Sequence, residues 1–139
     1  MIAKYGNLGA EEIYGQEMLY YLHERDWTHF GKYCALYFDT ASSRSEYPIS
    51  TISYVLLTHV SDRSVLDVAI KANRYDIETG KDRDPTGYDA YANLLYKVGR
   101  NQEAIELEER AVTLSAGRNP EIEEHLRKMR AGEPTWPTG

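Results

Sequence analysis

The stretch that decides the fold covers residues 84–120 and reads DPTGYDAYANLLYKVGRNQEAIELEERAVTLSAGRNP. It begins with Asp84-Pro85 and ends with Asn119-Pro120. Each pair is typical of a helix start, because an Asp or Asn side chain caps the first free amides and Pro fits the first helical position. Between the pairs, apolar residues recur at helical spacing on both sides of Gly99, a residue that favours a turn. The stretch therefore predicts two antiparallel helices, over about 85–98 and 102–115.

Features of this hairpin recur earlier and later in the chain. The two start signals lie 35 residues apart, and so do the pairs Ala69-Ile70 and Ala104-Ile105. One coincidence of this kind would mean little, but two that both fall on helix features indicate a repeat. Periods near 34 residues are typical of stacked helical hairpins. We therefore expect repeat-like hairpins over residues 50–84 and 85–119, the earlier copy being the more degenerate.

Helical periodicity also dominates the rest of the chain, and strand alternation is nearly absent. We predict irregular N-terminal helices within 10–40, a capping helix over 120–131 and an irregular tail over 132–139 with Trp136 packed back on the domain. The first helix should begin near Ala10, and Gly80 should end the fourth. The residues expected to face inward on the first and sixth helices are Ile13, Tyr14, Met18, Tyr21, Leu22, Ala104, Ile105, Ala111, Val112 and Leu114. The sequence thus predicts one all-α domain, residues 1–139, of about seven helices.

The hairpin at 85–119 resembles the tetratricopeptide repeat. The positions that match the family pattern of small, large and Gly residues are Ala92, Leu95, Gly99, Ala104 and Ala111. Small residues at these positions let two helices approach closely. Glu108 departs from the pattern, because the family usually has a large apolar residue there. The resemblance implies a superhelix of stacked antiparallel hairpins.

A second resemblance covers most of the chain from Asp26 onward. The helical C-terminal region of some bacterial thioredoxin-like proteins is similar to the segments 26–27, 60–62, 88–100, 103–105 and 132–136. This resemblance implies an accessory helical domain. It implies no thioredoxin chemistry, because Cys34 is the single cysteine and no paired-cysteine motif is present.

The tetratricopeptide resemblance also implies a binding groove lined by the first helix of each hairpin. Carried over by position, the groove residues are Thr51, Tyr54, Thr58, Thr86, Asp89, Asn93, Tyr96 and Lys97. Asn93 stands where family members often have a ligand-binding Asn. Asp89 stands where members that bind a peptide carboxylate have a basic residue, which argues against that type of ligand. The alternative is that these residues are solvated or lie in helix interfaces and bind nothing.

Composition excludes several classes of function. The net charge of −6 disfavours a nucleic-acid partner, which requires a basic surface. No apolar run approaches the roughly 18 residues of a membrane helix, so we expect no membrane insertion. The first residues lack the apolar core of a signal peptide. We therefore expect a cytoplasmic protein if the chain is complete, whereas an exported protein stays open if the chain is a fragment.

The sequence shows no recognisable catalytic or cofactor motif. A phosphate-binding Gly-rich loop and a nucleophile elbow are both missing. Glu121 and His125 are four residues apart on a predicted helix, but such a pair is more often a surface contact than a metal site, and we expect neither a metal nor a cofactor. The predicted function is a non-enzymatic helical-repeat module that binds a protein or peptide. The alternatives are a structural accessory domain of a larger thioredoxin-like protein and a small enzyme with an unrecognised site.

Overall fold

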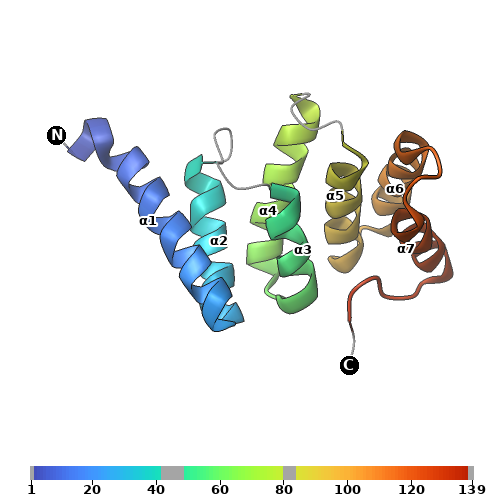
Figure 1. Cartoon of the computed structure of the whole chain (residues 1–139), viewed down its shortest axis with the longest axis horizontal. Coiled ribbons are helices and arrows are strands. Elements are labelled where there is room, and N and C mark those ends of the chain that lie inside the picture. The colour runs from blue at the N-terminus through green and yellow to red at the C-terminus, as the bar shows by residue number, and fades with distance from the viewer. Residues whose placement is uncertain (1, 42–48, 80–83, 138–139) are drawn as a thin grey trace.

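A computed structural model of the chain describes residues 2–41, 49–79 and 84–137. In these ranges the chain forms seven α-helices and no strand, which confirms the all-helical prediction (Figure 1). The helices are α1 (Ile2–Glu24), α2 (Trp27–Ala41), α3 (Ile49–His59), α4 (Arg63–Glu78), α5 (Pro85–Lys97), α6 (Asn101–Ser115) and α7 (Pro120–Ala131). Within the described ranges, none of the helices combines the length and the apolar character needed to cross a bilayer.

The first helix is longer than the sequence predicts. It begins at Ile2 and not near Ala10, and it includes Gly6 and Gly9. Each Gly weakens a helix by about 1 kcal/mol relative to Ala, but Gly does not forbid helical backbone. The prediction therefore placed the start too late.

The helix starts predicted from capping residues are confirmed. The side chains of Asp62, Asp84 and Asn119 each accept a hydrogen bond from a backbone amide in the first turn of α4, α5 and α7. Gly99 has a φ of 90°, so the α5–α6 turn uses the left-handed backbone that Gly favours. Thr79 is the C-cap of α4, and the predicted stop at Gly80 lies outside the described residues.

The helices run across the molecule from α1 and α2 at one end, through α3 and α4 side by side and then α5, to α6 and α7 at the other end (Figure 1). Helix α1 packs on α2, and α2 packs on α3 and α4. Helix α5 is central, because it contacts α3, α4, α6 and α7. Seven consecutive residues of α5, Ala90–Tyr96, are buried. The superhelical stacking that the tetratricopeptide resemblance implies stays a prediction.

The core holds most of the residues predicted to face inward. Ala92, Ala104 and Ala111 are fully buried, as expected for small residues between close helices. Two predictions were wrong: the side chains of Ile13 and Leu114 are 57% and 46% exposed. Both residues were predicted to face inward from helical periodicity. Periodicity identifies the apolar face of a helix, but it does not show how much of that face the neighbouring helices cover.

The C-terminal tail packs back on the domain, as predicted. The Trp136 ring lies 5.8 Å from the Tyr96 ring, measured between centroids. The hydroxyl of Tyr96 donates a hydrogen bond to the backbone carbonyl of Glu133 at 2.8 Å. The tail therefore covers the C-terminal end of α5.

Candidate functional site

The structure buries three of the residues that the sequence assigned to an open groove. Asp89, Asn93 and Tyr96 are almost inaccessible to solvent. Helices α6 and α7 and the tail cover α5, so these three side chains cannot contact an extended peptide on the surface. The groove prediction is corrected for these residues. Of the other predicted residues, Thr51 and Thr58 are exposed, and Tyr54, Thr86 and Lys97 are half-buried.

Lys97 has a structural contact in place of the predicted role in binding. Its amine donates hydrogen bonds to the backbone carbonyls of Leu57 at 2.6 Å and Val60 at 2.7 Å. These carbonyls lie at the C-terminal end of α3, where a cation is favourable because it offsets the helix dipole. Burial lowers the pKa of Lys97 below its ordinary value. Lys97 therefore joins α5 to the end of α3.

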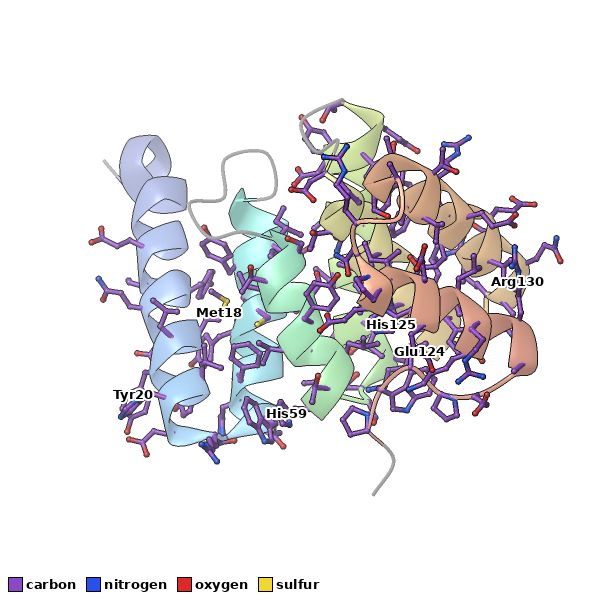
Figure 2. The ribbon with its side chains drawn as sticks, turned by 45° about the vertical axis from the view of Figure 1, so that its right-hand side comes forward. Met18, Tyr20, His59, Glu124, His125 and Arg130 are labelled. Carbon is purple, nitrogen blue, oxygen red and sulfur yellow. The ribbon has the colours of Figure 1, made fainter. Side chains whose placement is uncertain are left out.

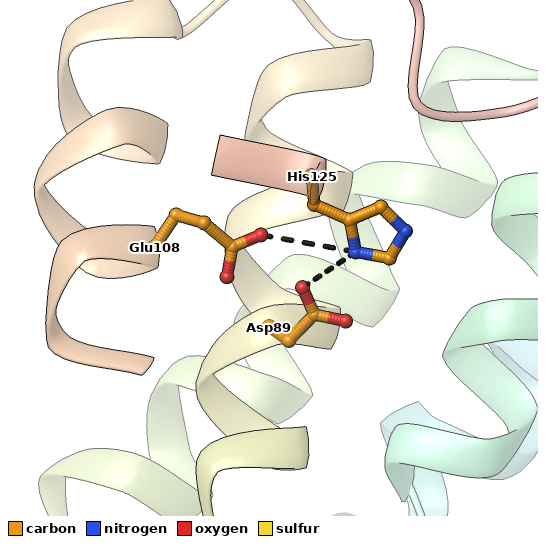
Figure 3. A group of neighbouring side chains, drawn as sticks. All are labelled: Asp89, Glu108 and His125. Atoms are coloured by element: carbon orange, nitrogen blue, oxygen red, sulfur yellow. Dashed lines mark hydrogen bonds and ion pairs between the residues drawn. The ribbon is translucent and has the colours of Figure 1, made fainter. Parts of the chain in front are cut away.

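Three of the buried polar residues lie beside the half-buried His125 in a cluster, which we define as Asp89, Asn93, Glu108 and His125. Its residues lie on three helices, with Asp89 and Asn93 on α5, Glu108 on α6 and His125 on α7. Figure 3 shows the side chains of Asp89, Glu108 and His125 pointing toward one another. The Nδ1 atom of His125 lies 2.8 Å from Oδ1 of Asp89 and 4.0 Å from Oε2 of Glu108. One ligand atom from each of these three residues lies within 4.8 Å of the other two.

Two further side chains hold Asp89 in place. The amide nitrogen of Asn93 donates to the backbone carbonyl of Asp89 at 2.7 Å and to its Oδ1 at 2.9 Å. The hydroxyl of Tyr54, on α3, donates to Oδ2 of Asp89. Both carboxylate oxygens of Asp89 are therefore hydrogen-bonded, which fixes the orientation of the group.

The environment gives the two carboxyl groups different protonation states at neutral pH: Asp89 is ionised and Glu108 is protonated. Burial is the main cause that raises the pKa of Glu108 to about 11, and the hydrogen bond and negative charge of Asp89 raise it further. Burial also raises the pKa of Asp89, but the hydrogen bonds from His125 and Glu108 outweigh burial and lower its pKa below the ordinary value. Two like charges this close are unfavourable when buried, so the pair keeps one proton at neutral pH.

The cluster leaves two polar atoms unsatisfied. Asn93 and Glu108 are both 0% exposed. Their Oδ1 and Oε1 atoms have no hydrogen-bond partner among the described residues. An unpaired buried polar atom is costly, commonly about 1–3 kcal/mol, so such atoms usually mark a site with a further role.

Sequence reasoning missed Glu108 and His125 as members of one site. Glu108 was noted only as a departure from the family pattern, and His125 was paired with the exposed Glu121. The repeat period carried a usable signal. Tyr54 and Asp89 are 35 residues apart and occupy corresponding places on α3 and α5, and His125, 36 residues after Asp89, lies one residue beyond the corresponding place on α7. A polar residue at the same place on successive helices indicates a polar row between them.

Among the described residues, Asp89, Glu108 and His125 are the group whose ligand atoms lie close enough together that they could hold a metal ion. No known family model matches the chain, and comparisons with curated proteins and with solved structures find no match. The resemblances to tetratricopeptide repeats and to thioredoxin-like proteins therefore stay predictions.

Proposed function

We propose that this chain is a non-enzymatic helical-repeat module that binds another protein, and that it uses the outer face of α1 to do so. The observation that carries the proposal is the exposure of large apolar side chains on this helix. Ile13 and Tyr20 are 57% and 55% exposed, and Leu19 is also exposed. Several large exposed apolar side chains on one helix favour a binding surface over a plain solvated face.

The register of α1 places these residues together. Ile13 and Tyr20 are seven residues apart, which is two helical turns, so they lie on one face. Met18 is fully buried and packs toward α2. Figure 2 shows Met18 on the inner side of α1 and Tyr20 on the outer side. In the described part of the chain only α2 packs on α1, so no other described helix covers the outer face of α1.

The opposite end of the molecule differs in character. The outer face of α7 is largely charged, and the exposed charged residues of this helix are Glu121, Glu123, Glu124, Arg127 and Arg130. Helical-repeat proteins need a polar outer surface on the terminal helix for solubility. Helix α7 has this property of a cap, whereas α1 exposes Ile13, Leu19 and Tyr20 over its described side chains, which supports binding at the α1 end. Exposed Glu12 and Glu24 flank the apolar residues, so the best partner has an apolar centre and a basic rim.

The accessory-domain alternative would use the same face, with the partner surface belonging to another domain of the same polypeptide. Both functions predict that α1 is covered in the working assembly. They differ in whether the partner is a separate chain, which the capture experiment below decides.

The test compares capture of proteins from a cell extract by the wild type and by two variants. Ile13→Glu with Tyr20→Glu places charges on the α1 face, and Leu114→Glu is the control at another exposed apolar residue. Leu114 lines a pocket with Tyr88, Glu109, Arg110 and Thr113. We expect quantitative mass spectrometry to show a partner that the α1 double variant loses by about tenfold or more and the control retains, since central apolar contacts commonly contribute about 1–2 kcal/mol each. A partner lost only by Leu114→Glu would place binding at the pocket and contradict the proposal.

A further inference from the structure

We propose that Asp89, Glu108 and His125 form a binding site for a divalent first-row transition-metal ion that joins α5, α6 and α7. This inference is independent of the proposed function of α1. The ligand atoms are a carboxylate oxygen from each acidic residue and Nδ1 of His125. Each of the three helices contributes one ligand (Figure 3).

The distances suit an ion of this size. Metal–ligand bonds of about 2.0–2.2 Å place the ligand atoms of a tetrahedral site about 3.3–3.6 Å apart. Nδ1 of His125 lies 2.8 Å from Oδ1 of Asp89, which is below this range, and 4.0 Å from Oε2 of Glu108, which is above it. The carboxylate oxygens of Asp89 and Glu108 lie within 4.8 Å of each other, so side-chain shifts of about 1 Å convert the cluster into a coordination site.

The charges of the cluster also favour a cation. Both carboxyl groups are buried, and their hydrogen-bond partners among the described residues include no Lys or Arg. Glu108 is 0% exposed, and its Oε1 has no hydrogen-bond partner in the described part of the chain although the carboxyl group is directed at Asp89 and His125. A divalent ion would displace the proton that Glu108 holds at neutral pH, which is released to solvent. The ion would then offset the negative charge of the two carboxylates and give this oxygen a partner.

The surroundings match those of protein metal sites. Ligating carboxylates are usually held by further hydrogen bonds, and Tyr54 and Asn93 provide them for Asp89. The His125 side chain is 21% exposed, so the ion can enter from its side. An imidazole with two carboxylates favours ions such as Zn²⁺, Co²⁺ or Mn²⁺ over Ca²⁺ and Mg²⁺, which prefer oxygen ligands alone. Three protein ligands leave a fourth position for water or another ligand.

The experiment measures binding of Zn²⁺ and Co²⁺ to the untagged, EDTA-treated full chain by titration calorimetry, with the Co²⁺ absorption spectrum as a report on coordination. We expect one ion per chain. We expect His125→Ala and Glu108→Gln each to weaken binding by about tenfold or more while circular dichroism shows an unchanged helical fold. Tyr54→Phe should weaken binding by about tenfold, because it removes the hydrogen bond that orients Asp89.

The matched control is His29→Ala. His29 also lies beside an aspartate, with Nδ1 at 2.7 Å from Oδ2 of Asp26, but this pair is exposed and its two residues are only three apart in the sequence, at the start of α2. The control should bind the ion like the wild type. Binding that survives both His125→Ala and Glu108→Gln, or that only His29→Ala removes, would show a surface contact and overturn the proposal. An absence of Zn²⁺ and Co²⁺ binding by the folded wild type would overturn it as well.

Discussion

The protonated state of Glu108 makes a direct prediction about stability and pH in the metal-free protein. The perturbation is Glu108→Gln, which keeps the size of the side chain and its ability to donate a hydrogen bond but removes the titrating group. The pKa of Glu108 is about 11 in the folded chain, against an ordinary value of 4.5. Between these two values, the folded state keeps a proton that the unfolded state releases.

The sign follows from proton linkage. A group whose pKa is higher in the folded state than in the unfolded state stabilises the fold. This contribution is complete below the ordinary pKa and is lost as the pH rises through the folded-state pKa. Each pH unit in this window lowers the free energy of unfolding by about 1.4 kcal/mol. From pH 6 to pH 8 the wild type should therefore lose about 2.7 kcal/mol more than Glu108→Gln. Asp89 adds no pH dependence of its own in this window, because its pKa lies below 3.8.

The assay is urea unfolding followed by circular dichroism at pH 6 and pH 8, with EDTA present throughout. Glu106→Gln is the matched control, because Glu106 is an exposed residue of the same helix. The control should have the pH dependence of the wild type. If Glu108→Gln has that same pH dependence, then Glu108 is ionised in the folded protein and the reasoning about the buried carboxyl pair is wrong.

Two further predictions concern packing and the single cysteine. Ala104 is fully buried on α6, so Ala104→Phe should lower the free energy of unfolding by about 1–3 kcal/mol, and an unchanged thermal melting curve would show that the site has room for a ring. Cys34 is also fully buried, and burial raises the pKa of its thiol well above the ordinary value. Iodoacetamide should therefore react with the thiol only after urea unfolds the chain, since the reactive species is the thiolate; rapid alkylation of the native protein would contradict this.

The sequence predicted the helices well because their ends depend on local chemistry. The caps at Asp62, Asp84 and Asn119, and the turn at Gly99, use hydrogen bonds and backbone angles within a few residues. Such signals are visible in a single sequence. The start of α1 was placed too late because no capping signal marks it, and a helix without such a signal has no sharp boundary in the sequence.

The candidate site was predicted only in part, because its residues are far apart in the chain. Asp89 and Asn93 were assigned to one helix face, which is a local property. Whether that face meets solvent or another helix depends on where α7 packs, and the sequence does not specify this. The prediction therefore placed both residues on an open groove, whereas α6 and α7 cover them.

By itself, the sequence determined the helical class, most of the helix boundaries and the burial of the small residues at the hairpin crossing, since each follows from periodicity and local backbone chemistry. Only the tertiary structure decided that Glu108 and His125 lie beside Asp89, and that Ile13, Leu19 and Tyr20 of α1 are exposed. Contacts between helices depend on the packing of the whole chain, and a carboxyl group acquires its protonation state from the neighbours that this packing supplies. The repeat period indicates which positions in successive hairpins correspond to one another, but it does not show which of these residues are in contact.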